Sequence, residues 1–368
     1  MLGRVVVSPG PRLPFEIREY PVADPGPEEI LVKVTLAGVC GSDLHMWRGE
    51  TPPLQKAPGV PGHEMTGVVA RLGRNRQRDT LGRPLKEGDR VAFAYFIPCG
   101  ACWACLTGTT GCPHRYRDRA QLTVDDPPHF HGAYADYYYL LPRQWVYRVP
   151  DELPDELVAP VNCALSQVIY GLHRIGIWLG DTVVIQGAGG LGINAVAVAR
   201  EMGAGRIIVI DGVPERLELA RAFGADETIN LREMPDRADR VARVRELTGG
   251  TGADVCVEVA GVAAVVQEGI EMLRVGGRYL MMGNIVPNAP AQIVPHDAVR
   301  QPKTLLGVLS YDAWVIPRAL DWLVRARHRY PFDRLLAARF PLEQINEAFQ
   351  QADWAAEAGR IPRALITI

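Results

Sequence analysis

The sequence predicts an α/β protein in which a doubly wound parallel sheet follows a β-rich first part. Before about residue 150, β-branched runs bounded by Gly and Pro, such as 30–39 and 66–73, are typical of strands, and no helical period of useful length is present. From about residue 165, strands and helices alternate, which favours βα units and a parallel sheet. A chain of 368 residues is long enough for two domains of ordinary size.

The elements of the second part follow one another in a regular order. The run 182–186 is typical of a strand, and the apolar spacing of 192–203 predicts a helix that ends at a glycine. After a strand at 206–211, a helix begins with Pro214 in a favourable first-turn position and ends at Gly224. The remaining predicted elements are a strand at 254–261, a helix through 273, a strand at 276–285, helices at 313–326 and 341–352, and a strand at 363–368.

The last segment is expected to return to the first part of the chain. The predicted domains are therefore residues 1–165 together with 309–368, and residues 166–308.

Composition argues against several classes of partner. Apolar residues make up 48% of the chain and charged residues 22%, which is typical of a soluble globular protein. A formal net charge of −2 gives no basic field for nucleic acid or an anionic membrane. The start of the chain is broken by prolines and has no long apolar segment, so we expect no signal peptide and a cytoplasmic location. The uncharged run 182–199 contains four glycines, which favours a buried strand–turn–helix over a membrane span.

A glycine-rich turn, QGAGGLG, joins the first of the alternating strands to its helix. Gly187, Gly189 and Gly192 have G-x-G-x-x-G spacing. In such a turn the first glycine permits the tight bend, the second lets the backbone approach a pyrophosphate, and the third packs helix against strand. The phosphates then lie at the helix N-terminus, so Gly190 and Leu191 are also assigned to cofactor binding. A glycine turn in some other α/β protein is the alternative.

An acidic residue at the end of the next strand bears on the choice of dinucleotide. Asp211 lies nineteen residues after Gly192, where a carboxylate accepts a hydrogen bond from the ribose 2′-hydroxyl. Gly212 and Val213 offer no positive charge to a 2′-phosphate, so NAD is favoured over NADP. Arg216 is the counter-argument, since it could turn towards such a phosphate, and Asp211 could instead be a helix cap.

Cysteine spacing predicts a structural zinc site. Cys99, Cys102, Cys105 and Cys112 form a C-x2-C-x2-C-x6-C cluster. Four local thiolates fill the tetrahedral coordination of zinc and leave no position for substrate. In a reducing compartment such a cluster is more often metal-binding than disulfide-bonded.

Three dispersed residues, Cys40, His63 and Cys163, offer a second donor set. Three protein ligands leave one position of zinc open for substrate, which is the arrangement of a catalytic site. The remaining cysteine, Cys256, lies within a strand pattern and is interpreted as a buried apolar residue.

Together these motifs resemble the zinc-dependent medium-chain alcohol dehydrogenases, of the medium-chain dehydrogenase/reductase family. The matching segments are GVCGSDLH, GHEMTG, the four-cysteine cluster, Cys163, GAGGLG with Asp211, and PRALITI, and they stand in the family's order over nearly the whole chain. The resemblance implies a GroES-like catalytic domain with a zinc lobe at about 96–114, a Rossmann domain that binds NAD, and two zinc ions per chain. It also implies a homotetramer, with a homodimer as the alternative.

The chain departs from the family pattern in two respects. The family usually has seven residues before the last cysteine of the cluster, and this chain has six, so the lobe could be reshaped or bind zinc less tightly. The segments 74–85 and 115–131 look longer than usual. Near the end of the chain, Arg363 matches a family residue that contacts the cofactor phosphates.

The resemblance implies roles for polar residues around the dispersed donor set. Ser42 would hydrogen-bond the substrate oxygen, and His45 would complete a proton relay at the ribose. Asp43 would orient the ligand His63. Glu64 would approach the metal from behind, although a buried charge paired with an Arg is a nearly equal interpretation.

These features predict an oxidoreductase that transfers hydride between NAD and an alcohol, giving a ketone or aldehyde. A secondary, bulky or cyclic alcohol is expected from the long segment 115–131 and the tyrosine-rich GAYADYYYLL. His129 and His131 beside this segment are interpreted as surface residues without a ligand role.

Other functions account for fewer of these residues. A polyol or amino-alcohol dehydrogenase of the sorbitol or threonine type is the alternative, although such relatives tend to carry Glu where Cys163 stands. A zinc-free quinone reductase would leave the dispersed donor set without a purpose. A non-enzymatic zinc-ribbon module would leave the glycine turn unexplained.

Overall fold

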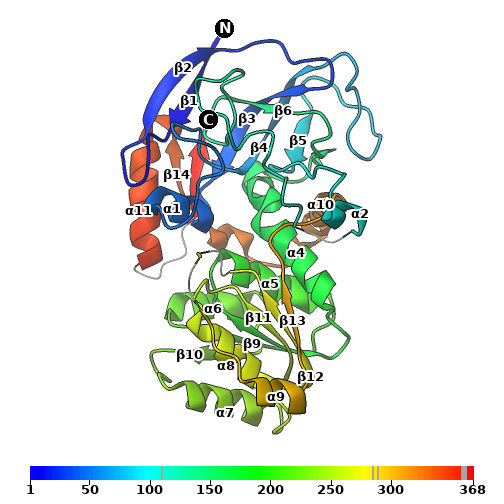
Figure 1. The fold of residues 1–368 in the computed structure, drawn as a ribbon, viewed down its shortest axis with the longest axis vertical. Coiled ribbons are helices and arrows are strands. Elements are labelled where there is room, and N and C mark those ends of the chain that lie inside the picture. The colour runs from blue at the N-terminus through cyan, green and yellow to red at the C-terminus, as the bar shows by residue number, and fades with distance from the viewer. Residues whose placement is uncertain (109–110, 284–285, 288–289, 358–362) are drawn as a thin grey trace.

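The chain builds two parts, which lie one above the other in Figure 1. The computed structural model describes residues 1–108, 111–283, 286–287, 290–357 and 363–368. The lower part is a sheet with helices packed around it, and the upper part combines strands from the beginning and the end of the chain (Figure 1). Among the described helices, none has both the length and the apolar character needed to cross a membrane.

The lower part is a six-stranded parallel sheet, as the alternating pattern predicts. Its strands are β8 (Thr182–Gln186), β9 (Arg206–Asp211), β10 (Glu227–Asn230), β11 (Ala253–Glu258), β12 (Leu273–Met281) and β13 (Thr304–Gly307). They lie in the order β10-β9-β8-β11-β12-β13, and every pair is parallel. The order reverses between β8 and β11, and in such sheets ligands bind at the carboxyl ends of the strands beside this switch point.

Helices connect these strands. They are α5 (Gly190–Glu201), α6 (Pro214–Ala222), α7 (Arg237–Leu247), α8 (Ala264–Met272) and α9 (Pro295–Arg300). The central strands are almost wholly buried and rich in Val and Ile, which is typical of a parallel sheet covered on both faces.

The upper part contains a seven-stranded sheet. Its strands are β3 (Ile30–Gly38), β4 (Glu64–Leu72), β5 (Arg90–Phe93), β6 (Tyr137–Leu140), β7 (Val146–Arg148), β14 (Leu336–Pro341) and β15 (Arg363–Thr367). The order is β14-β15-β3-β4-β5-β7, with β6 also paired to β3. A separate hairpin joins β1 (Leu2–Val7) to β2 (Glu16–Pro21). The last segment therefore returns to the first part, as expected.

The strands of the parallel sheet all lie within 182–307. The domain boundaries after residues 165 and 308 stay a prediction.

The remaining helices lie in the upper part or between it and the parallel sheet. They are α1 (Gly41–Arg48), α2 (Trp103–Leu106), α3 (Asp155–Val158), η1 (Ala159–Asn162), α4 (Ala164–Ile175), α10 (Val315–Ala326), η2 (Phe332–Leu335), η3 (Leu342–Gln344) and α11 (Ile345–Glu357). Helix α1 lies in the part of the chain where the sequence shows no helical period of useful length. This helix has eight residues, too few for a clear apolar period, and its ends are fixed by local contacts instead. Asp43 accepts the Cys40 N–H at 2.9 Å at the start, and Gly49 with φ +78° ends it.

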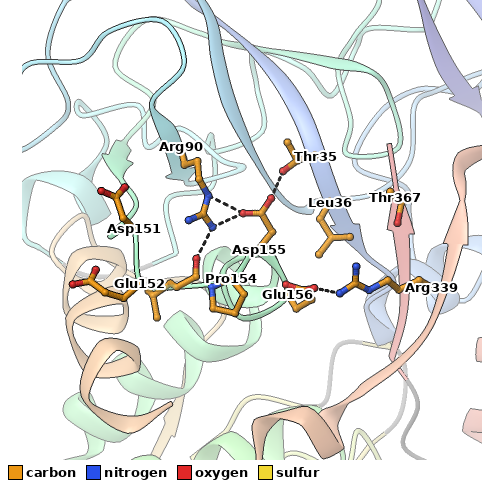
Figure 2. A pocket seen from close by; sticks show the side chains of 11 residues that line it. Thr35, Leu36, Arg90, Asp151, Glu152, Pro154, Asp155, Glu156, Arg339 and Thr367 are labelled. Carbon is orange, nitrogen blue, oxygen red and sulfur yellow. Dashed lines mark hydrogen bonds and ion pairs between the residues drawn. The ribbon is translucent and has the colours of Figure 1, made fainter. Parts of the chain in front are cut away.

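A polar cavity of about 570 Å³ lies where α3 meets the upper sheet (Figure 2). Asp155 at the start of α3 accepts hydrogen bonds from Thr35 Oγ1 on β3 at 2.5 Å and from Arg90 Nε on β5 at 3.0 Å. These contacts attach α3 to two strands. Because α3 continues through η1 to Cys163, they also fix the segment that delivers this cysteine.

Candidate metal centre and cofactor site

Four side chains from three distant segments converge beside α1. One ligand atom from each of Cys40, His63, Glu64 and Cys163 lies within 4.8 Å of the others. The Sγ atoms of Cys40 and Cys163 are 3.9 Å apart, and His63 Nε2 is 3.3 Å from Cys163 Sγ. Thiolate, imidazole and carboxylate are the donors that zinc prefers, so this catalytic cluster fits a zinc ion.

The fold brings these residues together at the ends of strands. Cys40 follows β3, and His63 directly precedes β4. Since β3 and β4 are antiparallel, with Gly38 opposite Glu64, the two segments lie side by side. Cys163 comes from the break between η1 and α4, and η1 packs against β3 and β4 of the upper sheet.

The imidazole of His63 is held from behind by Asp43. Nδ1 of His63 lies 2.9 Å from Asp43 Oδ1, and both side chains are buried. Donation of the Nδ1 proton to the carboxylate leaves the Nε2 lone pair directed at the cluster. Burial lowers the pKa of His63, but the adjacent carboxylate outweighs this effect and the net shift is upward. The structure therefore places Asp43 where the sequence predicts an orienting partner.

Ser42 and His45 both lie on α1, and the catalytic cluster lies at the start of this helix. Ser42 Oγ is 3.4 Å from His63 Nε2, so the hydroxyl lies at the edge of the donor set. His45 is half-buried, and its Nδ1 is 2.5 Å from Glu50 Oε2. This hydrogen bond lowers the pKa of Glu50.

Glu64 is fully buried within the cluster. Its carboxylate packs against the backbone of β3, because a Cβ at Gly38 would come within 2.7 Å of Glu64 Oε2.

The four clustered cysteines form a second donor set, the lobe. Within the described part of the chain, one Sγ from each of Cys99, Cys102, Cys105 and Cys112 lies within 4.8 Å of the others. Two backbone N–H groups also point at sulfur, Cys102 N–H at 3.3 Å from Cys99 Sγ and Cys99 N–H at 3.4 Å from Cys112 Sγ. Cys112 Sγ reaches 3.8 Å from Cys102 Sγ, so six intervening residues suffice to close the lobe. Residues 109 and 110 of this short loop lie outside the described part.

The glycine turn has the geometry that its spacing predicts. Gly187 has φ +104°, a left-handed conformation that favours glycine. A Cβ at Gly192 would lie 1.9 Å from the Gly187 carbonyl oxygen, so helix and turn touch there. A Cβ at Gly189 would meet no protein atom within 4 Å, which leaves open space beside the backbone. Gly190 and Leu191 are the first residues of α5, so the turn and the helix N-terminus face this space together.

Asp211 connects the end of β9 to the glycine turn. Its Oδ2 accepts the Ala188 N–H at 2.7 Å, and its Oδ1 accepts the Val213 N–H at 2.9 Å. Nη1 of Arg216 lies 3.9 Å from the same carboxylate. The two residues that compete in the choice between NAD and NADP are therefore neighbours. The side chain of Arg363 lies outside the described part.

Three residues beside the catalytic cluster are not among those that the sequence predicts. The ring of Tyr95 lies 4.7 Å from that of His63, and Tyr116 stacks on Tyr95 at 6.2 Å. Asn162 donates from Nδ2 to the His63 carbonyl oxygen at 3.0 Å. The position of Asn162 directly before a predicted ligand was an available signal, whereas the two tyrosines offered none.

The tyrosine-rich stretch 132–141 and the two histidines before it pack inside the fold or bond to the backbone. Tyr134, Tyr138 and Tyr139 are each at most 2% exposed, so they pack inside the fold and give no support for a bulky substrate. The interpretation of His131 as a surface residue was wrong, since it is 4% exposed. His131 Nε2 contacts the Asp126 carbonyl, and His129 Nδ1 contacts the Val124 carbonyl, each at 2.9 Å.

Comparisons with known proteins agree with this geometry. The family described as alcohol dehydrogenase GroES-like domain matches residues 26–151, and the family described as zinc-binding dehydrogenase matches residues 190–325. The 5-exo-hydroxycamphor dehydrogenase of Pseudomonas putida is 36% identical over 339 residues, which cover 91% of each chain. The sorbitol dehydrogenase of Bacillus subtilis is 32% identical over 344 residues, covering 92% of this chain and 90% of the relative.

Among solved structures, an alcohol dehydrogenase from Thermotoga maritima superposes with a TM-score of 0.90 and 30% identity, covering 100% of this chain and 99% of that one. The fold, the two zinc-site-like clusters and the glycine turn all have their place in this family. The chain therefore belongs to the zinc-binding medium-chain alcohol dehydrogenases and is a zinc-dependent oxidoreductase linked to NAD or NADP.

Proposed function

We propose that this chain oxidises a bulky or cyclic secondary alcohol to the ketone with NAD, and that it catalyses the reverse reaction. The main support is the catalytic cluster, in which two sulfurs and an imidazole from distant segments meet beside Ser42. In this proposal Cys40, His63 and Cys163 hold the catalytic zinc and leave one position open. When bound there, zinc supplies a Lewis acid that lowers the pKa of a substrate hydroxyl, and the nicotinamide exchanges the hydride.

In this proposal the proton of the substrate hydroxyl leaves by way of two side chains of α1, Ser42 and His45. Ser42 Oγ, at the edge of the donor set, accepts this proton while its own hydroxyl proton passes outward. His45 receives the proton at the outer end of the relay. Because Nδ1 of His45 is occupied by Glu50, its Nε2 is the atom available to hold the proton.

The lobe has a structural role in this proposal. Cys99, Cys102, Cys105 and Cys112 together fill the coordination of a second zinc, so no substrate can bind to it. Glu64, from behind the catalytic cluster, offers a carboxylate for ligand exchange.

The proposed substrate class is supported by two stacked tyrosine rings beside the catalytic cluster and by one relative. Tyr95 and Tyr116 form a stacked pair whose inner ring touches His63, and flat aromatic surfaces favour an apolar substrate skeleton over a polyol. The relative named for 5-exo-hydroxycamphor has a bicyclic secondary alcohol as its namesake.

A sorbitol- or threonine-type activity is the second candidate. It is favoured by the relatives named sorbitol dehydrogenase and L-threonine 3-dehydrogenase, and by a carboxylate, Glu64, in the catalytic cluster. A polyol needs several hydrogen-bonding partners in the pocket, and the stacked tyrosine pair offers no more than its two phenol hydroxyls.

The proposed cofactor is NAD, bound at the glycine turn and at Asp211. The open space at Gly189 suits a pyrophosphate, and the N-terminus of α5 suits its charge. Asp211 presents a carboxylate where a 2′-phosphate would otherwise lie, and Arg216 is placed to pair with that carboxylate. Arg363 is proposed to contact the phosphates.

A homotetramer, or else a homodimer, stays a prediction to be tested by light scattering of the purified protein. The cytoplasmic location also stays a prediction.

A matrix of substrates and cofactors tests the proposed function. Initial rates would be measured with borneol, cyclohexanol, ethanol, sorbitol and L-threonine, each with NAD and with NADP. The wild-type protein is compared with Cys163→Ser, which removes a proposed ligand and changes a single atom. We expect the highest kcat/KM with a cyclic secondary alcohol and NAD, and loss of activity in the variant.

Other results of the same matrix contradict particular parts of the proposal. A preference for sorbitol or threonine overturns the substrate class, and a preference for NADP overturns the cofactor. Full activity of Cys163→Ser overturns the catalytic zinc assignment.

A further inference from the structure

Tyr134 lies behind the catalytic cluster, on the tyrosine-rich stretch that the proposed function leaves without a role. The residue is fully buried, and its hydroxyl oxygen is 3.1 Å from Asp43 Oδ2 and 3.1 Å from the Gly38 carbonyl oxygen. Of these two acceptors the carboxylate is charged and therefore the stronger. Burial raises the pKa of Tyr134 well above its usual value, so the phenol keeps its proton and donates it.

The backbone places this hydroxyl with little freedom. Ala133 N–H donates to the Gly62 carbonyl at 3.0 Å, and Tyr134 N–H donates to the Pro61 carbonyl at 3.3 Å. The tyrosine segment therefore runs along the turn that immediately precedes His63. Gly62 has φ +89°, and a Cβ there would lie 2.8 Å from the Tyr134 ring, so the ring rests on the bare backbone of this turn.

The Asp43 carboxylate accepts three hydrogen bonds, one on Oδ1 and two on Oδ2. Oδ1 accepts the Nδ1 proton of His63, while Oδ2 accepts the Cys40 N–H and the Tyr134 hydroxyl. Turning the carboxylate would remove Oδ1 from His63 and break both contacts of Oδ2. The two donors on Oδ2 thus fix the orientation of the oxygen that faces the imidazole.

Asp43 also lies close to a cavity. Asp43 forms part of the wall of a mainly apolar cavity of about 500 Å³, to which Phe15, Trp47 and Phe349 also contribute. The Asp43 side chain is nevertheless only 1% exposed, so packing and the three hydrogen bonds together hold the carboxylate in place.

We propose that Tyr134 is a positioning residue for the catalytic metal, acting through Asp43 on the ligand His63. The inference rests on the proposed function, because it presumes a zinc ion at the catalytic cluster. Without the hydroxyl, Asp43 keeps the Cys40 N–H as its remaining donor on Oδ2, so the carboxylate that orients the imidazole is held by one contact fewer. Partners of this kind typically change metal affinity or activity by about 10- to 100-fold.

The chain offers a matched control in Tyr138. This residue lies on the same stretch and is 1% exposed, and its hydroxyl accepts a hydrogen bond from Gln144 Nε2 at 3.1 Å. Tyr134→Phe and Tyr138→Phe each remove one buried hydroxyl and one hydrogen bond to a side chain, but only Tyr134→Phe removes a contact with Asp43.

The experiment measures zinc release from the full-length, zinc-loaded protein to the chromophoric chelator 4-(2-pyridylazo)resorcinol. The kinetic phase that is missing in Cys163→Ala belongs to the catalytic cluster. We expect this phase to be about tenfold faster in Tyr134→Phe and unchanged in Tyr138→Phe. With cobalt in place of zinc, the visible absorption bands of the catalytic cluster should shift in Tyr134→Phe and not in Tyr138→Phe.

A double-mutant cycle tests the route through Asp43. In an Asp43→Asn background Tyr134→Phe should have little further effect on zinc release, because both changes act on one chain of contacts. Equal release from both tyrosine variants, or an additive effect with Asp43→Asn, overturns this inference and leaves the proposed function standing. Absence of zinc from the cluster of the wild-type protein overturns the proposed function, and the inference with it.

Discussion

The Sγ atoms of Cys40 and Cys163 lie 3.9 Å apart, although 123 positions separate the two residues in the chain. Cys40 belongs to the end of β3 in the upper sheet, whereas Cys163 begins the helix α4 that leads to the parallel sheet. A metal held between these sulfurs would link two segments that are far apart in the chain, so its presence reports on whether these segments have come together.

Removing one of these sulfurs should remove one metal and leave the other. We expect Cys163→Ala to lower the zinc content from two ions per chain to one, because the lobe has its own four ligands. Cys256→Ala is the matched control, since Cys256 is also buried but lies within β11. Zinc content is measured by atomic emission on purified protein, and two retained ions in Cys163→Ala would refute the ligand assignment.

The two glycines of the cofactor turn should respond differently to the same substitution. Gly192→Ala places a Cβ 1.9 Å from the Gly187 carbonyl oxygen and should destabilise the fold by about 1–3 kcal/mol. Gly189→Ala meets no protein atom within 4 Å, so the melting temperature should stay close to that of the wild type. Its methyl group nevertheless occupies the approach of the pyrophosphate, so NADH affinity should fall.

Thermal unfolding and NADH fluorescence titration separate the two effects. Wild-type NADH affinity in Gly189→Ala would show that the dinucleotide does not approach this glycine.

Charge at the end of β9 should decide between NAD and NADP. Asp211→Asn keeps the size of the side chain and removes its charge, so the ratio of kcat/KM for NAD over NADP should fall by about tenfold or more, equivalent to about 1.4 kcal/mol. Arg216→Gln serves as the complementary variant. If Arg216 were the partner of a 2′-phosphate, its loss would abolish NADP use and leave NAD use intact, contrary to our expectation of little change in either.

Acid should destabilise the long segment through His131. Burial lowers the pKa of His131 to about 4, and its Nε2–H contact with the Asp126 carbonyl only partly opposes this. In the unfolded chain His131 is protonated below about pH 6.5, whereas in the folded chain it stays neutral down to about pH 4. The free energy of unfolding therefore falls as the pH falls through this window. At about pH 5 the loss is about 2 kcal/mol relative to neutral pH.

His131→Gln should reduce this acid sensitivity. The difference between urea midpoints at about pH 7.5 and about pH 5 should be smaller in the variant than in the wild type. His129→Gln, from the same loop, controls for the removal of an imidazole. If the difference between the two urea midpoints were the same in His131→Gln as in the wild type, His131 would not be the group responsible for the acid sensitivity.

The features that the sequence predicts correctly are those in which chemistry restricts residue type at short spacing. The glycine turn needs Gly187 and Gly192 because larger residues would collide there, and the lobe needs four sulfurs within reach of one another. Both leave a pattern in a few consecutive residues. The alternating strands and helices are equally legible, since each element buries its apolar face in a regular period.

The features that the sequence leaves hidden depend on contacts between distant segments. Tyr134 meets Asp43 from 91 positions away, and a tyrosine in a strand-rich region is ordinary, so nothing local marks its contact. The same holds for Tyr95 beside His63. Helix α1 leaves no clear signal for a different reason, because its eight residues are too few to form a distinct apolar period.

The pairing of β15 with β3 places the last segment of the chain directly beside the backbone that leads to Cys40. Leu365 pairs with Gly38, and Val39 N–H donates to the Ala364 carbonyl at 3.0 Å, directly before Cys40. On the ribosome, the four cysteines at 99–112 emerge well before residue 163 supplies the third ligand and residue 364 supplies this strand neighbour. The cysteines of the lobe can therefore come together while the chain is still being synthesised, whereas the strand neighbour of Cys40 arrives only after nearly the whole sequence has left the exit tunnel.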